Sequence, residues 1–309
     1  MQAVPQIQQS LAGLKLGPAQ VHLNLALFPL LDEQSVAPDY LLLDDALERK
    51  LARVTEVSAD GRVPELAFEN ASGEKVLLVD GDELVGAKQN RVLNLTILVG
   101  AGQKLVIPVS CVEQGRWVYR SKDFRSVRRT LFAKARAAKM RQVTESLVVN
   151  GERRSNQAEV WAAVAGKAAA YRVDSPTLAM ADVYEETAPR LNAYATAFRA
   201  EPSQRGAVVA IDGKPVGVEL FDSPTTFAHY LERLVGSYAL DAMETAGSVS
   251  PTPSADETRR FLESIAVAAC ERFQALGEGE DIRLRGDGIT GGALAVNGRL
   301  VHLAAFALA

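Results

Sequence analysis

The sequence predicts an α+β protein with a β-rich N-terminal part that contains hairpins, a helical middle, and C-terminal hairpins packed with helices. Three observations support this class. Short apolar segments flank Asp-Gly or Asn-Gly turns, Ala-rich segments with helical spacing fill the middle, and the two patterns do not alternate as regular βαβ units would. We expect one large domain over residues 1–309, divisible into a β-rich lobe, 1–122, and a helix-rich lobe with two hairpins, 123–309.

Strand and hairpin signals occur in both halves of the chain. Residues 21–31 read VHLNLALFPLL, which predicts a strand with a break at Pro29. Three later segments have two apolar arms around Asp-Gly or Asn-Gly, and these residues tolerate the positive φ angles of a tight turn. The predicted hairpins turn at residues 80–81, 212–213 and 297–298.

Helices are expected between the hairpins. Residues 40–51 favour a short helix, with a strand followed by a helical extension as the alternative. Phe124–Val148 is basic and Ala-rich, and its apolar residues recur near helical spacing, which predicts a long helix. Capping residues and Ser-Pro pairs predict further helix starts. Three of these helices begin near Ser155, Ser175 and Ser223, and a fourth extends over residues 256–276. The helix that begins near Ser175 is expected to be interrupted at Pro189.

Composition is that of a soluble globular protein. The chain has 309 residues, 48% of them hydrophobic and 23% charged, and a formal net charge of −4. No apolar run approaches the roughly 20 residues that a membrane helix needs, and the N-terminus lacks a secretory signal pattern. Its two cysteines, Cys111 and Cys270, lie far apart without metal-binding CxxC spacing. We expect a cytoplasmic protein with reduced thiols and no membrane partner.

The first candidate site is the segment DGDELVGAKQNRVLN at residues 80–94. It places Lys, Gln, Asn and Arg consecutively between two strand-like segments. Amides both donate and accept hydrogen bonds, and a guanidinium matches phosphate or carboxylate. We interpret Gln89, Asn90 and Arg91 as ligand-binding candidates and Glu83 as a candidate acid or base. The alternative is a polar network that satisfies backbone groups at a bent sheet edge.

The second candidate site is PVSCVEQGRWVYRS at residues 108–121. Its Glu113 is the second acid/base candidate, Arg116 is a phosphate-binding candidate, and Trp117 is a candidate for stacking on a base or sugar. A core role is the alternative for the Trp side chain. Gly100 and Gly102 mark a reversal between the two segments. A hairpin there would pair residue 91 with residue 111 and bring residue 89 near residue 113.

A basic run extends over residues 116–141, with ten Lys or Arg and one acid. Such a run can attract phosphate groups or RNA. We favour a solvated face or a partner for acidic surfaces of the same chain, so a nucleic-acid partner is not expected. The three histidines lack metal-binding spacing, and no metal site is predicted. The Gly-rich stretch GDGITGG at residues 286–292 lacks the following helix of a dinucleotide-binding motif.

The segments GDELVGAKQNRVLNLTILV, IPVSCVEQGRW, SNQAEVW and GKPVGVELFDS resemble one known family. It is the uncharacterised domain family associated with ADP-ribosylglycohydrolase and rhodanese-phosphatase proteins. The resemblance extends over about residues 77–242 and implies a role near ADP-ribose or NAD-derived metabolites. It provides no established catalytic residue. The positions that carry it are Gly81, Glu83, Gly86, Gln89, Asn90, Arg91, Cys111, Glu113, Arg116, Trp117, Gln157 and Trp161.

The leading hypothesis is a protein that binds or processes a phosphorylated sugar or nucleotide, such as an ADP-ribose-type metabolite. In it, Glu83 and Glu113 are the acid/base residues, and Gln157 joins the ligand-binding candidates. The alternative is a non-catalytic binding or scaffold protein in a stress or metabolite-response system. A small phosphorylated ligand is the expected partner, and the sequence specifies no cofactor and no oligomeric state. Convergence of the candidate carboxylates and arginines on one pocket would favour the first hypothesis.

Overall fold

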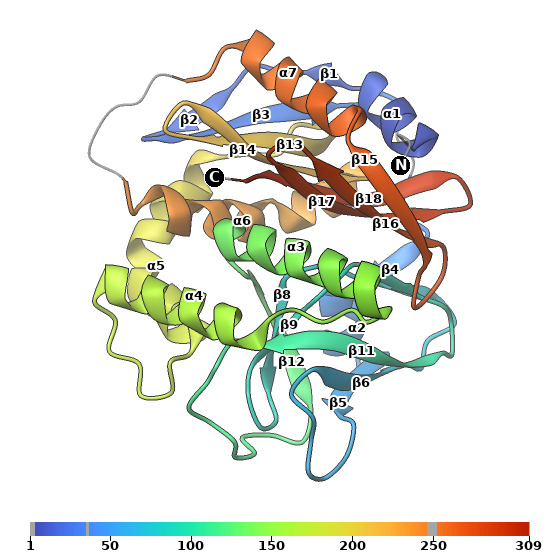
Figure 1. The fold of residues 1–309 in the computed structure, drawn as a ribbon, viewed down its shortest axis with the longest axis vertical. Helices are drawn as coiled ribbons and strands as arrows, with labels where there is room; N and C mark the ends of the chain where they lie inside the picture. Colours follow the sequence, from blue (N-terminus) through green and yellow to red (C-terminus); the bar gives the residue numbers. More distant parts are fainter. Residues whose placement is uncertain (1–3, 35–36, 246–251, 309) are drawn as a thin grey trace.

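The computed structural model describes residues 4–34, 37–245 and 252–308. Figure 1 shows a large sheet with helices on both faces, and a smaller β structure beyond the helices of one face. Seven helices and 18 strands in three sheets lie within the described residues. The predicted α+β class is therefore confirmed.

The largest sheet has nine antiparallel strands, drawn from both ends of the chain. Its central order is β1, β3, β13, β14, β18, β17, β16, β15, and β2 also pairs with β3. The strands are β1 (Lys15–Leu16), β2 (Gln20–His22), β3 (Leu25–Leu31), β13 (Gln204–Ile211), β14 (Lys214–Phe221), β15 (Ala269–Gln274), β16 (Glu280–Gly286), β17 (Ile289–Val296) and β18 (Arg299–Ala307). Two-residue turns at 212–213 and 297–298 close the predicted hairpins β13–β14 and β17–β18, with positive φ at all four turn residues.

Helices cover both faces of this sheet because its strands are apolar on both sides. Along β3, Leu25 and Leu27 enter one apolar cluster, and Ala26 and Phe28 enter the other. Figure 1 shows α1 and α7 on one face and α3 and α6 on the other, with α4 and α5 beside them. Their bounds are α1 (Pro5–Ala12), α3 (Ala133–Asn150), α4 (Gln157–Tyr171), α5 (Met180–Ala197), α6 (Pro224–Ala242) and α7 (Ala255–Ala266).

The second β structure consists of a six-stranded antiparallel sheet and a three-stranded sheet. The six strands, in order, are β12 (Phe124–Thr130), β8 (Asp82–Gly86), β9 (Arg91–Leu93), β11 (Lys104–Cys111), β6 (Glu65–Asn70) and β5 (Ala52–Glu56). The smaller sheet contains β10 (Ile97–Val99), β7 (Lys75–Leu78) and β4 (Tyr40–Leu42), and α2 (Leu43–Glu48) follows β4. Arg53 Nε lies 2.7 Å from Asp123 Oδ1, so an ion pair joins the β5 and β12 ends of the six-stranded sheet.

Several predicted elements were wrong because tertiary pairing overrides local pattern. The turn at residues 80–81 joins no hairpin, since β7 and β8 enter different sheets. Residues 124–130 form β12 on the edge of β8 instead of the first turns of a helix. Residues 40–42 form a strand before α2, which is the alternative considered for that segment. The predicted lobes also exchange strands, because β1–β3 join the nine-stranded sheet and β12 joins the six-stranded one.

Helix boundaries differ from prediction at four further places. Asn156, not Ser155, caps α4 by accepting hydrogen bonds from two backbone N–H groups. The predicted helix start at Ser175 lies before α5, and Pro189 lies inside α5 without ending it. Pro29 likewise lies within β3. Residues 269–274 form β15, where the last helix was expected to continue. No helix in the described ranges has the length and apolar character needed to cross a membrane.

Candidate functional site

The polar segment 88–91 follows β8 and leads into β9, of which Arg91 is the first residue. Gly86 ends β8 with a φ of +139°, and a Cβ there would lie 2.7 Å from the Asp123 carbonyl oxygen. Glycine is therefore required where the chain passes the segment that leads into β12. The connection is buried although it is polar, since each of its four residues is at most 8% exposed. These side chains must find partners inside the protein.

The pairing of β9 with β11 brings the two predicted clusters together. Arg91 is the register partner of Cys111, as the sequence predicts. Next to the ladder, the Asn90 N–H donates to Glu113 Oε2 at 3.0 Å. The expected proximity of the clusters is confirmed. The simple hairpin expected between them is wrong, because β10 pairs with β7 in another sheet.

Glu113 is the centre of the resulting hydrogen-bond network. Arg116 donates from Nε to Oε1 (2.9 Å) and from Nη2 to Oε2 (2.6 Å), and Thr177 Oγ1 donates to Oε1 (3.0 Å). Burial favours a higher pKa for Glu113, but the hydrogen bonds from Arg116 and the Asn90 N–H outweigh it and hold the pKa below its usual range. Glu113 is therefore an ionised carboxylate whose two oxygens are both engaged.

The Arg116 guanidinium directs all of its nitrogens at protein acceptors. Besides Glu113, Nη1 donates to the carbonyl oxygens of Ala87 (2.6 Å) and Val118 (2.9 Å), and Nη2 donates to Asn90 Oδ1 (3.1 Å). These bonds tie the segment after β11 to the connection after β8. A ligand would have to replace at least one of them in order to bind Arg116.

Arg91 is buried but only partly engaged. Its Nη1 donates to Gln89 Oε1 (3.1 Å), whereas Nε and Nη2 have no hydrogen-bond acceptor among the described residues. Nη2 lies 4.0 Å from Glu56 Oε1, and Cζ lies 5.7 Å from the centroid of the Trp117 ring. Trp117 is 44% exposed, so it forms the surface of the cluster and Arg91 lies behind it.

Glu83 lies outside this hydrogen-bond network, on β8 opposite Val92. Both of its carboxylate oxygens are buried without a donor among the described residues, and Arg129 Nε lies 3.4 Å from Oε2. Burial, only partly offset by Arg129, raises the pKa of Glu83 to about 7. The two predicted acid/base residues thus have pKa values shifted in opposite directions. Neither carboxylate lines the open cavity that lies beside the cluster, between β5 and residues 119–122.

Gln157 fixes the backbone of β11. Its Oε1 accepts from the Cys111 N–H (2.8 Å), and its Nε2 donates to the Cys111 carbonyl oxygen (2.8 Å). The side chain therefore satisfies this peptide as a neighbouring strand would. The Cys111 thiol is buried and donates to Gln89 Oε1 at 3.2 Å. Burial raises the pKa of this thiol, which favours its neutral form.

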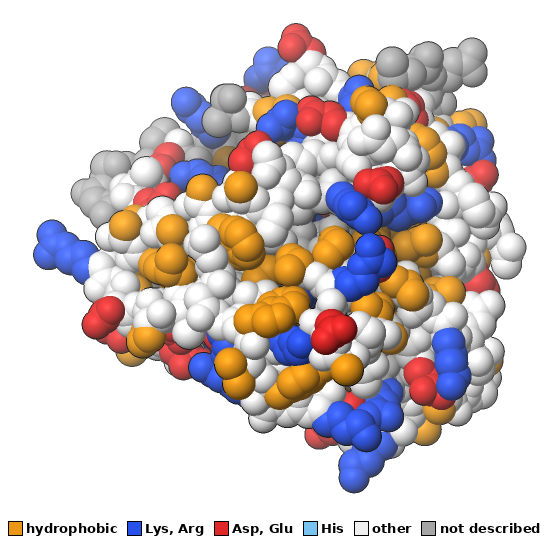
Figure 2. All heavy atoms as spheres, turned by 60° about the horizontal axis from the view of Figure 1, so that its bottom comes forward, with side chains coloured by type: hydrophobic (Ala, Val, Ile, Leu, Met, Phe, Trp, Pro, Cys, Tyr) orange, Lys and Arg blue, Asp and Glu red, His pale blue; other side chains and the backbone are white. Residues whose placement is uncertain are grey.

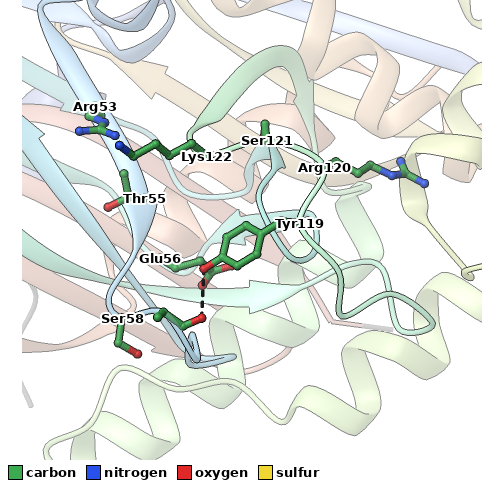
Figure 3. Close-up of a pocket in the computed structure, with 9 residues that line it drawn as sticks. Arg53, Thr55, Glu56, Ser58, Tyr119, Arg120, Ser121 and Lys122 are labelled. Atoms are coloured by element: carbon green, nitrogen blue, oxygen red, sulfur yellow. Dashed lines mark hydrogen bonds between the residues drawn. The ribbon is translucent and has the colours of Figure 1, made fainter.

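An open cavity of about 700 Å³ lies beside the cluster. Its walls come from β5 with the residues after it and from the segment after Trp117. The lining residues are Arg53, Thr55, Glu56, Ser58, Ala59, Tyr119, Arg120, Ser121 and Lys122. Figure 3 shows the charged ends of Arg53 and Lys122 near one another, whereas Arg120 extends away from them. Glu56 links the cavity to the cluster, because its Oε1 accepts from the Lys88 N–H at 3.3 Å.

The basic run divides into a buried part and an exposed part. On α3, Lys139 pairs with Asp80, and Arg136 Nη1 donates to Glu219 Oε1 at 2.5 Å, with all four side chains buried. The expected pairing with acids of the same chain therefore occurs inside the protein. The exposed members of the run are Arg120, Lys122, Arg125, Arg128, Lys134 and Arg141. Figure 2, which brings the bottom of Figure 1 forward, shows clusters of Lys and Arg beside a band of hydrophobic side chains.

The charged and aromatic cavity residues that were missed from the sequence are Arg53, Glu56 and Tyr119. The first two belong to an ordinary alternating strand, and the third follows the candidate Trp117. The available signal was the charge run, whose members Arg120 and Lys122 line the same cavity. No group of three His, Cys, Asp or Glu side chains in the described parts of the chain is placed to hold a metal ion.

Comparison with known proteins identifies the family. Residues 13–306 match the ARG and Rhodanese-Phosphatase-superfamily-associated Protein (ARPP-1) domain, which is nearly the whole chain. No curated protein and no solved structure matches the chain significantly. The match includes the β9–β11 cluster, strands of all three sheets and the helices α2 to α7. The chain therefore belongs to the ARG and Rhodanese-Phosphatase-superfamily-associated Protein domain family.

Proposed function

We propose that the protein binds a phosphorylated sugar or nucleotide, such as an ADP-ribose-type metabolite, in the cavity between β5 and residues 119–122. The observation that carries the proposal is the set of cations at this cavity. Arg53, Arg120 and Lys122 come from two distant segments and line a space of about 700 Å³. This volume falls within the range of small-molecule sites. The family's association with ADP-ribosylglycohydrolase proteins supports the same ligand class.

Each wall of the cavity suits a different part of such a ligand. Arg53 and Lys122 are placed to bind phosphate, with the guanidinium giving paired hydrogen bonds and the ammonium a compact charge. The Arg53 charge is only partly neutralised by Asp123, since both side chains are exposed by more than 40%. Tyr119 is 48% exposed and offers an aromatic face to a base or sugar.

The proposal covers binding, not catalysis. Glu113 already accepts hydrogen bonds at both oxygens, and Glu83 is closed to solvent. We assign Glu113 and Arg116 a supporting role, in which they hold the segment that carries Tyr119. Trp117 covers Arg91 from the same segment. The network thus gives the cavity a fixed wall, which reduces the entropy lost on binding.

Ligand-induced stabilisation tests the proposal. ADP-ribose, ADP and ribose 5-phosphate are titrated while the melting temperature is recorded. A ligand at 100 times its dissociation constant stabilises the fold by about 2.7 kcal/mol. The double variant Arg53→Gln/Lys122→Gln is expected to bind at least about tenfold more weakly, because two phosphate contacts are lost.

The matched control removes two cations elsewhere. Lys104 and Arg141 are exposed and form surface ion pairs, as Arg53 does. The variant Lys104→Gln/Arg141→Gln is expected to bind like the wild type. Absence of stabilisation by all three ligands would overturn the proposal, and equal weakening in both double variants would show a general charge effect instead of a site.

A further inference from the structure

Glu56 is a buried carboxylate that lines the proposed ligand cavity. Only 3% of its side chain is exposed. Oε1 accepts from the Lys88 N–H, whereas Oε2 is buried and has no hydrogen-bond donor among the described residues. Arg91 Nη2 lies 4.0 Å from Oε1, beyond hydrogen-bonding distance. A buried acceptor without a donor destabilises the folded protein, because it has lost its hydration. A ligand that donates a hydrogen bond to Oε2 would remove this cost.

The space beside Oε2 is kept by a glycine. Gly61 has a φ of +70°, and a Cβ at this position would lie 3.2 Å from Glu56 Oε2. A side chain there would occupy the space against the carboxylate. Arg53, Thr55 and Glu56 all line the cavity, and they are exposed, half-buried and buried respectively, so the carboxylate is at the floor of the cavity and the Arg53 cation is at its rim.

We propose that Glu56 is the residue that recognises the sugar, and that the ligand is a phosphorylated ribose with free 2′ and 3′ hydroxyl groups. This inference rests on the proposed function. An ionised carboxylate only accepts hydrogen bonds, so its ligand partner must be a donor. A phosphate group would be repelled at the floor and is held by Arg53 and Lys122 at the rim, whereas vicinal hydroxyls supply two donors to one carboxylate.

Tyr119 lines the cavity together with Glu56 (Figure 3). Oε2 is closed to solvent, and Tyr119 lines the same cavity with its ring half-exposed. One hydrogen bond holds the Tyr119 hydroxyl, to the Ala59 carbonyl oxygen at 3.2 Å (Figure 3). We expect the Tyr119 ring to turn onto the sugar when the ligand binds, away from the Lys88 ammonium 5.1 Å from its centroid. Glu113 and Arg116 meanwhile hold the backbone of its segment in place. The turn would uncover Oε2 and give the ligand an aromatic face.

A pair of ligands that differ only in the hydroxyls tests the assignment on the wild-type chain. ADP and 2′,3′-dideoxy-ADP share the base and the diphosphate, and their affinities are measured by calorimetry. ADP is expected to bind about 10- to 100-fold more tightly, which is the effect of losing hydrogen bonds to a charged group. Equal affinities would overturn the role of Glu56 and leave the proposed function standing. Failure of ADP and its dideoxy analogue to bind, with binding of ADP-ribose or ribose 5-phosphate retained, would overturn this inference alone, whereas failure of all of these ligands would overturn the proposed function with it.

Variants of the chain then test which residue gives the preference for ADP over 2′,3′-dideoxy-ADP. Glu56→Gln keeps the shape of the side chain but removes its charge, and it is expected to lose most of the preference for ADP. Gly61→Ala is expected to lower the affinity for ADP toward that for the dideoxy ligand, because the added methyl group occupies the space at Oε2. Glu69→Gln, an exposed carboxylate on the adjacent strand, is expected to keep the full preference. A full preference in Glu56→Gln would overturn the assignment to Glu56.

Discussion

Arg116 and Glu113 form a two-point ion pair inside the protein, with Nε 2.9 Å from Oε1 and Nη2 2.6 Å from Oε2. Their side chains are 6% and 0% exposed. A buried pair of this kind adds little stability relative to a well-packed apolar pair, because both charges lose their hydration. Removal of one partner destabilises the fold strongly, because the other charge stays buried without an opposite charge beside it.

Replacement of Arg116 by Ala is expected to lower the free energy of unfolding by roughly 3–5 kcal/mol. The Glu113 carboxylate would retain only the Asn90 N–H and Thr177 Oγ1 as close donors. Denaturation by urea, followed by circular dichroism without any ligand, measures the loss. This result would assign Arg116 to the fold, whereas a ligand-binding role predicts an unchanged stability and a weaker ligand response.

Arg120 supplies the matched control because it approaches the same carboxylate. Its Nη2 lies 3.8 Å from Glu113 Oε1, but its side chain is 61% exposed. Arg120→Ala is expected to change the free energy of unfolding by less than about 1 kcal/mol. Similar stabilities for the two variants would contradict the structural role of Arg116.

Glu83 is expected to make stability depend on pH. Its pKa in the folded state is about 7, against 4.5 for an unperturbed carboxyl. The unfolded chain therefore loses this proton first as pH rises, and folding stability falls between about pH 4.5 and pH 7. Glu83→Gln removes this term, so the variant should gain roughly 3 kcal/mol relative to the wild type from pH 4 to pH 8.

Denaturation curves at several pH values measure this relative gain, which is independent of any constant offset caused by the substitution. Glu185→Gln is the control, since Glu185 contacts the same Arg129 but is 69% exposed. Its stability relative to the wild type is expected to change much less over this pH range than that of Glu83→Gln, because the exposed Glu185 charge acts on Glu83 only weakly through solvent. A constant difference for Glu83→Gln as well would show that the buried carboxyl does not titrate as its surroundings indicate.

The Asp-Gly and Asn-Gly signals predicted where the chain reverses more reliably than they predicted which strands pair. The Asp-Gly and Asn-Gly turns at 212–213 and 297–298 join paired strands, whereas the same signal at 80–81 joins strands of different sheets. A tight turn fixes only a few φ and ψ angles. Which strand lies beside each arm depends on distant segments, as the pairing of β8 with β12 shows. That pairing also explains why residues 124–130 are not helical.

The polar cluster was predictable because its members lie next to one another in sequence and one register decides their contacts. The Arg91–Cys111 pair followed from the spacing of the two segments around residues 100–102. Glu56 had no comparable signal. It is an alternating position of a short strand, and only the fold brings it to Arg91 and leaves one of its oxygens without a donor.

Lys139 is expected to be essential for the position of α3. It is fully buried, pairs with Asp80, and donates to the Leu93 carbonyl oxygen at 2.7 Å. Lys139→Met should lower the free energy of unfolding by roughly 3–5 kcal/mol, because the Asp80 carboxylate loses its hydrogen-bonded cation and keeps only Arg136, whose Nε lies 3.6 Å from Oδ2. Addition of Asp80→Asn should recover part of the loss, with a coupling energy of at least about 1 kcal/mol in a double-mutant cycle.

Lys134 on the same helix is the control for this cycle. Its side chain is 64% exposed and pairs with Glu244. Lys134→Met is expected to change the free energy of unfolding by less than about 1 kcal/mol. If Asp80→Asn rescues nothing in the Lys139→Met background, the unpaired carboxylate is not the source of the instability.

Gln157 gives the sharpest separation between a structural and a ligand-binding role. Its amide engages both the N–H and the carbonyl oxygen of Cys111, a residue with no exposed surface. Gln157→Ala leaves two buried backbone groups unpaired and should cost about 1–3 kcal/mol of unfolding free energy, measured by urea denaturation. Gln157→Glu keeps the acceptor but turns a carboxylate toward the Cys111 carbonyl oxygen, so it should be destabilised as well. Gln114→Ala, at an exposed position nearby, should match the wild type. A stable Gln157→Ala chain with weakened nucleotide binding would return this residue to the ligand site.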